Sequence, residues 1–123
     1  MKIGEAIENA RELMAGAVSD ETLLRWLSAL DGQVKLEIID THAGGGEVLF
    51  TPYGEDTDTD TELLIPQPYD EVYRYFLEAQ MLFANGELEE YNAVAARYEE
   101  SYAAYAAWYN RTHMSKQRGG WRW

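Results

Sequence analysis

The hydrophobic positions between Glu87 and His113 follow a strict alternation of three and four residues. This spacing is typical of a helix that packs lengthwise against another helix. The residues that share this face are Leu88, Tyr91, Ala95, Tyr98, Tyr102, Tyr105, Tyr109 and Thr112. At about 1.5 Å per residue the predicted helix is roughly 39 Å long. We expect its N-terminal half to supply a core stripe to its own domain.

The abundance of tyrosine on this face favours assembly. Tyrosine provides a large contact area with few rotatable bonds, and its hydroxyl group tolerates a partly hydrated site. We therefore expect part of the helix to contact another subunit. The predicted subunit-interface residues are Tyr91, Tyr98, Tyr102, Tyr105, Trp108 and Tyr109.

Two helices are predicted near the start of the chain. The first spans about Lys2–Ala15. The second begins at an N-cap, either Ser19 or Asp20, and the glycines at 44–46 end the helical pattern. The pair Asp31-Gly32 predicts a bend or a close backbone contact within the second helix, because glycine destabilises a helix interior.

The middle of the chain predicts a small β-hairpin and a further helix. Short apolar runs at 47–51 and 61–66 flank a polar stretch, which is typical of two strands joined by an acidic tip. The third helix spans 69–85, and Asn85-Gly86 stops it directly before the last helix. The last two helices should therefore form an antiparallel pair.

The predicted fold class is mainly α: two N-terminal helices and a long antiparallel C-terminal helix pair, with a hairpin inserted at about 47–66. Residues 1–114 are expected to form a single domain, and 115–123 a flexible basic and aromatic arm. The predicted core residues are Trp26, Leu27, Leu30, Val34, Phe76, Phe83 and Tyr98.

Charge is distributed unevenly along a chain whose net charge is −12. Residues 47–71 contain eight acidic residues and no basic residue, whereas residues 111–123 contain four basic residues and no acidic one. Affinity for nucleic acid comes largely from Lys and Arg that displace counterions, so the body should repel a phosphate backbone and only the arm could attract one.

Other composition features restrict the function classes. The sequence contains no cysteine, so disulfides, thiol nucleophiles and thiolate metal sites are excluded. It has no apolar run long enough for a transmembrane helix, and its acidic, amphipathic start does not resemble a signal peptide. These features favour an intracellular protein with no membrane association.

Candidate metal and catalytic motifs are weak. Asp56, Asp58 and Asp60 match the first ligand positions of a calcium-binding EF-hand loop, but Thr61 stands where the loop needs glycine and no helices flank it. A solvated acidic loop is therefore the preferred interpretation, and its members are Glu55, Asp56, Asp58, Asp60 and Glu62. It is also a candidate lining for a channel.

The two histidines, His42 and His113, are each predicted at a helix C-terminus, where the helix dipole favours a cation. A zinc site shared between them lacks supporting ligand spacing. No nucleophile motif or buried carboxylate pair is apparent, so we expect no cofactor and no catalysis.

The arm has three interpretations. Its residues could grip nucleic acid by charge and stacking, add as a strand to a partner, or form a frayed terminus. Exposed indoles are rarely left unused, so we favour docking to a partner. The predicted docking residues are Lys116, Arg118, Trp121, Arg122 and Trp123.

Four segments together resemble the head–tail connector (head-completion or neck adaptor) proteins of long-tailed bacteriophages and their prophages. They are RWLSALDGQVKLEIIDTH (25–42), DTELLIPQPYDEVY (60–73), AQMLFANGELEEYN (79–92) and AAYAAWYNRTHM (103–114). The resemblance implies a structural virion protein with no chemistry. It implies a homo-oligomeric ring, usually of twelve subunits, that docks on the portal protein and extends the channel through which DNA passes. The arm or the hairpin would then contact the portal or the next neck or tail-completion protein.

Two functions therefore follow as hypotheses. The first is a connector in the phage neck, made in the host cytoplasm and located in the virion. An acidic wall suits it, because a basic lining would hold the phosphates of passing DNA. The alternative is an acidic DNA mimic that inhibits a host nucleic-acid-binding protein through the carboxylates of 55–62.

Overall fold

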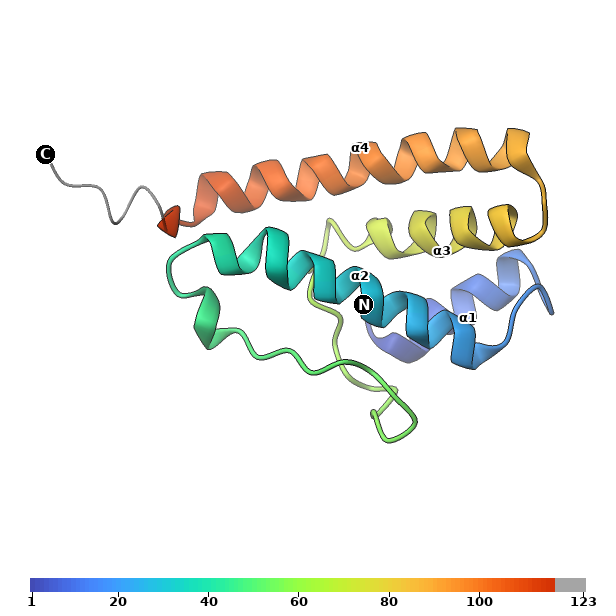
Figure 1. Cartoon of the computed structure of the whole chain (residues 1–123), viewed down its shortest axis with the longest axis horizontal. Coiled ribbons are helices and arrows are strands. Elements are labelled where there is room, and N and C mark those ends of the chain that lie inside the picture. The colour runs from blue at the N-terminus through green and yellow to red at the C-terminus, as the bar shows by residue number, and fades with distance from the viewer. Residues whose placement is uncertain (117–123) are drawn as a thin grey trace, which may run out of the picture.

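Residues 1–116 are described by the computed structural model, and this part of the chain is mainly helical (Figure 1). The helices are α1 (Ile3–Leu13), α2 (Asp20–Glu37), α3 (Glu71–Ala84) and α4 (Leu88–Thr112). Two short 3₁₀ helices, η1 (Ile39–Thr41) and η2 (Gly45–Glu47), follow α2. The mainly helical prediction is therefore confirmed, and the bounds of α1, α3 and α4 lie within a few residues of those expected. α2 is shorter than expected, because it ends at Glu37 and a 3₁₀ helix precedes the glycines at 44–46.

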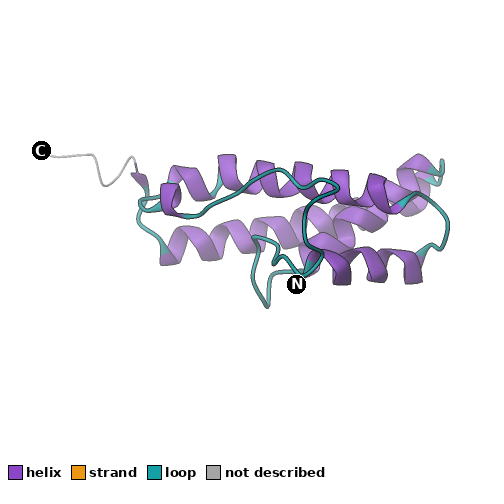
Figure 2. Ribbon diagram, turned by 90° about the horizontal axis from the view of Figure 1, so that it is seen from below, coloured by secondary structure: helices purple, strands orange, loops and turns teal. Residues whose placement is uncertain are grey.

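The helices form an elongated bundle (Figures 1 and 2). α3 and α4 run antiparallel, and α3 also contacts α1 and α2. The turn between α3 and α4 satisfies the last carbonyl groups of α3: the amide of Glu87 donates to Leu82 O (3.0 Å) and that of Gly86 to Phe83 O (3.1 Å). Gly86 has a φ of 77°, which glycine adopts without strain, so Asn85-Gly86 ends α3 as the sequence predicts.

α2 begins as expected but does not bend at its glycine. The Ser19 hydroxyl accepts a hydrogen bond from the amide of Thr22 (3.2 Å), which makes Ser19 the N-cap. The helix is continuous through Asp31 and Gly32. A Cβ at position 32 would lie 3.7 Å from the Phe50 ring, so this glycine faces a close neighbour from the following loop.

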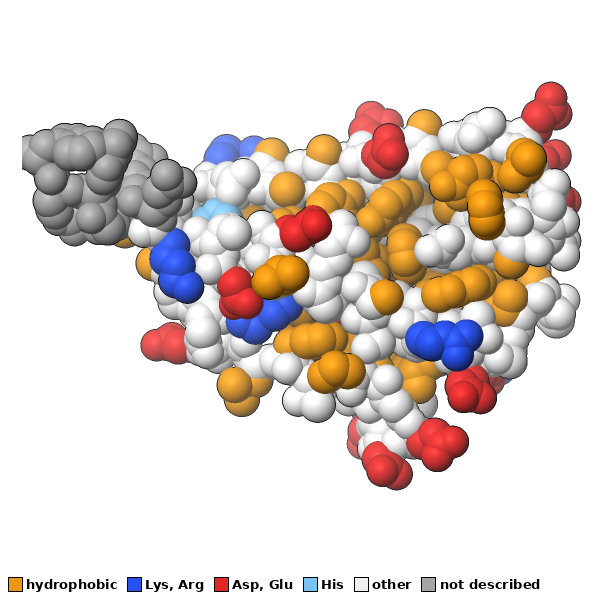
Figure 3. All heavy atoms as spheres, viewed as in Figure 1, with side chains coloured by type: hydrophobic (Ala, Val, Ile, Leu, Met, Phe, Trp, Pro, Cys, Tyr) orange, Lys and Arg blue, Asp and Glu red, His pale blue; other side chains and the backbone are white. Residues whose placement is uncertain are grey.

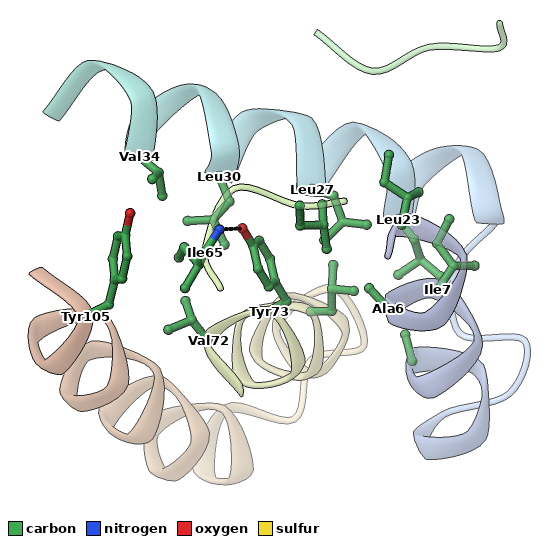
Figure 4. Close-up of a cluster of buried hydrophobic side chains, with 14 of the residues drawn as sticks. Ala6, Ile7, Leu23, Leu27, Leu30, Val34, Ile65, Val72, Tyr73 and Tyr105 are labelled. Atoms are coloured by element: carbon green, nitrogen blue, oxygen red, sulfur yellow. Dashed lines mark hydrogen bonds between the residues drawn. The ribbon is translucent and has the colours of Figure 1, made fainter. Parts of the chain in front are cut away.

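The core lies between the four helices and the end of the central loop (Figure 4). Its fully buried large side chains are Ile3, Leu23, Leu27, Leu30, Val34, Ile65, Val72, Tyr73, Leu77, Met81 and Tyr105. The predictions for Leu27, Leu30 and Val34 are confirmed. Trp26, Phe76 and Tyr98 are only half-buried, and Phe83 is 57% exposed, so the prediction that Phe83 is a core residue is wrong.

The misplaced residues of α3 share one physical reason. α3 packs against α1 and α2 as well as α4. It fully buries Tyr73, Leu77 and Met81, and the Tyr73 ring points toward α2 in Figure 4. Phe76 and Phe83 lie on the side toward α4, where each contacts one tyrosine ring. One helix alone covers this side, so it stays partly open to solvent.

The predicted β-hairpin at 47–66 is not present: the described chain contains no strand, only two isolated β-bridges (Figure 2). The second apolar run pairs instead with the start of the chain, because the amide of Ile3 donates to Thr61 O (3.0 Å) and that of Leu63 to Met1 O (2.9 Å). Leu63 and Ile65 are buried against helices, whereas Leu49 is 88% exposed. The two apolar runs thus contact different parts of the chain and do not form hydrogen-bonded strands with each other.

Candidate assembly surfaces

A buried carboxylate holds the central loop against the helices. Asp31 on α2 is fully buried and accepts hydrogen bonds from the hydroxyls of Tyr53 (2.5 Å) and Tyr73 (2.6 Å). It also accepts one from the amide of Leu64 (3.0 Å). The Tyr73 hydroxyl in turn accepts a hydrogen bond from the amide of Ile65 (2.7 Å; Figure 4). One carboxylate therefore fixes α2, α3 and both ends of the segment 53–65.

This network positions the loop and sets the protonation of its members. Burial raises the pKa of Asp31 and outweighs the three hydrogen bonds, which lower it. Burial and the nearby Asp31 also raise the pKa of Tyr53 and of Tyr73, so both hydroxyls stay protonated and donate at neutral pH. Both oxygens of the carboxylate are used within the fold. Sequence reasoning missed this role, although an acidic residue within the apolar stripe of α2 was a visible signal.

The carboxylates of the predicted acidic loop are all exposed. Glu55, Asp56, Asp58, Asp60 and Glu62 lie at the surface, and the acidic side chains of this loop project from the lower edge of the molecule in Figure 3. Local turns shape the loop, since Asp58 Oδ1 accepts from the amide of Asp60 (2.8 Å) and Thr57 Oγ1 from that of Gly54 (2.8 Å). Within residues 1–116, no three His, Asp or Glu side chains converge to hold a metal ion.

The six aromatic residues predicted for a subunit interface fall into two groups. Tyr105 and Tyr109 are buried within the chain's own core, so the structure does not leave them available to a second copy. The other four are half-buried: Tyr91, Tyr98, Tyr102 and Trp108. Burial raises the pKa of Tyr98 and of Tyr102 to about 12 in each case.

The half-buried rings form a ladder along the seam between α3 and α4. Tyr91 contacts Phe83 with ring centroids 5.2 Å apart, and Tyr98 contacts Phe76 at 5.3 Å. At the far end Trp108 packs against Tyr69, also at 5.3 Å. Each ring keeps an outer part exposed, so the accessible surface of the seam is aromatic.

The N-terminal half of α4 departs from the expected core stripe. α4 has 25 residues, of which only Tyr105 and Tyr109 are buried, and both lie in its C-terminal half. None of the residues 88–104 is buried. The prediction that the N-terminal half forms the core stripe is therefore wrong, because α1 and α2 pack against α3 there and leave α4 on the outside.

A histidine cluster anchors the end of α4 to the end of α2. The His42 ring is buried, with Nδ1 2.6 Å from Ile38 O and Nε2 2.8 Å from Asn110 Oδ1. His113 stacks on the Tyr109 ring at 3.7 Å, and the His42 and His113 ring centroids lie 6.3 Å apart. The two histidines that the sequence places at separate helix ends thus meet at one end of the bundle.

The described start of the arm continues from this cluster. The amide of Ala43 donates to Met114 O (2.8 Å), and Lys116 Nζ donates to Asp40 O (3.2 Å). Lys116 is exposed. The other predicted docking residues, Arg118, Trp121, Arg122 and Trp123, lie outside the described residues. The arm therefore leaves the bundle beside the C-terminal end of α2.

Comparisons with known proteins identify no relative of this chain. No protein-family model matches this chain, and searches of curated proteins and of solved structures find no significant similarity. In the part of the chain that the structure describes, no helix is both long enough and apolar enough to cross a membrane. The functional argument therefore rests on the residues and their geometry.

Proposed function

We propose that this protein is a structural connector whose copies form a ring, dock on a phage portal and extend its DNA channel in the neck of the virion. The observation that carries the proposal is the exposure of α4, a 25-residue helix with two buried residues. Helices in proteins gain most of their stability from tertiary packing, so a long helix with so few buried residues is suited to pack against a further partner. A ring of identical copies supplies such a partner along the whole helix.

The aromatic seam and the outward face of α4 both suit this role. Tyr91, Tyr98 and Tyr102 present partly exposed rings, which are enriched at protein interfaces. The outward face carries small exposed residues that allow another helix to approach closely: Ala93, Ala96, Ala103 and Ala107. The subunit interface on α4 remains a prediction, which this accessible surface supports. The docking role of the arm also remains a prediction.

The acidic character of the molecule suits contact with moving DNA. The net charge is −12, and the five loop carboxylates are all exposed. A surface of this sign does not retain a phosphate backbone, because no counterions are displaced when the two approach. The acidic loop is therefore our candidate for the part of the ring that faces the channel.

The test is to mix the full chain with its portal protein and to measure the mass by light scattering and native mass spectrometry. We expect a ring on the portal with a single copy number. Ala103→Glu, which places a charge on the exposed face of α4, should abolish the ring. Ala29→Glu makes the same change at an exposed position of α2 and should leave the ring intact. A chain that stays monomeric and does not bind the portal would overturn the proposal.

The exposed loop also supports a second candidate, a DNA mimic that inhibits a basic nucleic-acid-binding protein. Its carboxylates stand clear of the helices, as a charged recognition surface requires. This function would not need the arm, so deletion of 117–123 separates the two. Loss of assembly with an intact fold supports the connector, and unchanged binding to a basic partner supports the mimic.

A further inference from the structure

A groove of about 760 Å³ lies between α1, the first turns of α2 and the central loop. Its apolar part is formed by Ile7, Leu24 and Tyr53. Gly54 also borders it, and a Cβ at this position would have nothing within 4 Å, so the glycine leaves space there. The groove thus has the volume and the apolar surface to receive an aromatic side chain.

The rim of the groove carries more free carboxylates than free cations. Arg11 is already paired with Asp20 through two hydrogen bonds, at 2.9 and 2.6 Å. Among the described residues, Glu21 and Glu55 remain on the rim, against the single cation of Arg25. The other carboxylates of the acidic loop follow Glu55 directly. An occupant that combines aromatic rings with positive charge would complement both the floor and the rim.

The arm of this chain has that composition. Residues 117–123 read QRGGWRW, with two tryptophans, two arginines and no acidic residue. We propose that this segment of one copy occupies the groove of the next copy. The inference rests on the proposed ring and names the contact that would close it.

The length of the arm, compared with the length of α2, favours a contact between copies. The arm leaves the bundle at Lys116, beside Asp40 and beyond the C-terminal end of α2. The groove is bordered by 20–25 in the first turns of α2. Figure 1 shows how far apart the two ends of this helix lie. Leu24 and Glu37 are separated by roughly 20 Å of helix. Five residues separate Lys116 from Trp121 and span about 17 Å when fully extended. The arm would therefore have to be stretched along the whole length of α2 for Trp121 to approach its own groove, whereas a neighbour whose groove end faces the arm needs no such extension.

The contact joins two different surfaces, so it is heterologous and repeats from copy to copy. A contact of this kind generates a ring when the rotation between copies closes. The assembly that we propose for the whole protein thus follows from the polarity of one subunit, which carries the arm at one end and the groove at the other.

Photocrosslinking tests the location directly. The full chain with Trp121→p-benzoylphenylalanine is mixed with an equal amount of ¹⁵N-labelled chain and irradiated, and crosslinked peptides are identified by mass. We expect crosslinks between copies that end in 4–11, 20–25 or 53–59. Crosslinks confined to one copy, crosslinks that end elsewhere, or no crosslink between copies would overturn the inference.

A charge exchange tests the pairing. Glu55→Lys should weaken self-association about ten-fold, and Arg122→Glu should do the same; the double variant, which restores opposite charges, should recover most of the loss. Glu47→Lys is the matched control, because it changes the net charge equally at an exposed site outside the groove. Since each Lys variant reduces the repulsion between acidic copies, only a local contact explains weaker association. Equal effects of Glu55→Lys and Glu47→Lys would overturn the inference.

The two proposals fail in different ways. If rings form on the portal while these variants behave like the parent chain, then the arm–groove contact is wrong and the connector function stands. If arms crosslink to grooves but the portal is never bound, the assembly contact stands and the connector function fails.

Discussion

At the scale of single residues, Asp31 decides how the central loop is placed. Its carboxylate accepts hydrogen bonds from three donors on two other segments, and the side chain is fully buried. A buried polar group is costly when its partners are missing, so the network is stable only as a whole. The groove depends on it as well, because Tyr53 lies both in the network and in the groove wall.

Asp31→Ala should destabilise the protein strongly. The variant leaves two tyrosine hydroxyls and the amide of Leu64 without an acceptor, and each unsatisfied buried group costs about 1–3 kcal/mol. We expect the free energy of unfolding in urea to fall by at least about 3 kcal/mol. Asp56→Ala, at an exposed position of the same loop, should change it by less than about 0.5 kcal/mol. A small loss for Asp31→Ala would show that the network is not formed in solution.

The same residue should make stability depend on pH in a defined direction. Because burial raises the pKa of Asp31 above its ordinary value of 3.8, the folded state binds this proton more tightly than the unfolded chain. The contribution of Asp31 is therefore fully present below pH 3.8 and is lost as pH rises through the higher folded pKa. Asp31→Asn cannot titrate at this position.

We accordingly expect the stability difference between the parent chain and Asp31→Asn to narrow as pH rises above 3.8. Urea unfolding at several pH values measures it, and Asp56→Asn serves as the control with a constant difference. A gap that widens with pH would mean that the three hydrogen bonds outweigh burial and that the pKa is lowered.

At the scale of elements, the helices were predictable and the middle of the chain was not. Periodicity placed α1 to α4 because apolar residues recur on one face of each helix, and Ser19 and Gly86 marked two boundaries through known capping chemistry. A five-residue apolar run has no comparable signal for its partner. Residues 61–65 pair with the chain start and the core rather than with 47–51, so the hairpin prediction failed.

Neither the Asp31 network nor the histidine cluster at the end of the bundle could be predicted from local sequence patterns, and the reason is the same for both. Tyr53 and Tyr73 lie 22 and 42 residues from Asp31, and Asn110 lies 68 residues from His42. Sequence spacing identifies neighbours on one helix but gives no distance between helices. Of the candidate sites, the exposed loop could be anticipated from charge alone, whereas the groove depends on how α1, α2 and the loop come together.

The uneven burial of α4 predicts a gradient of local stability. Residues 88–97 contribute no buried side chain, whereas 105 and 109 are core residues. Amide hydrogens of the first half should therefore exchange about ten-fold faster or more than those of 102–112, since opening there exposes little apolar surface. Hydrogen–deuterium exchange with mass spectrometry on the isolated chain measures this. Uniform protection along α4 would contradict the gradient, and on the portal the first half should become protected.

At the scale of the whole molecule, net charge and assembly oppose each other. Each copy has a net charge of −12, and a ring brings like-charged bodies side by side. The arm–groove contact and the aromatic seam must overcome this repulsion. Salt screens it, because the Debye length falls from about 30 Å at 0.01 M to about 10 Å at 0.1 M ionic strength.

Self-association of the connector should therefore strengthen between about 20 and about 200 mM NaCl, which sedimentation or light scattering at fixed protein concentration measures. The Asp56→Asn/Asp60→Asn variant carries less charge on the exposed loop, so its association should depend less on salt. A DNA mimic behaves oppositely, because its attraction to a basic partner is itself screened and weakens in salt. Self-association that declines with salt would thus mean that repulsion between acidic copies does not control assembly and that the charge attraction between arm and groove outweighs it.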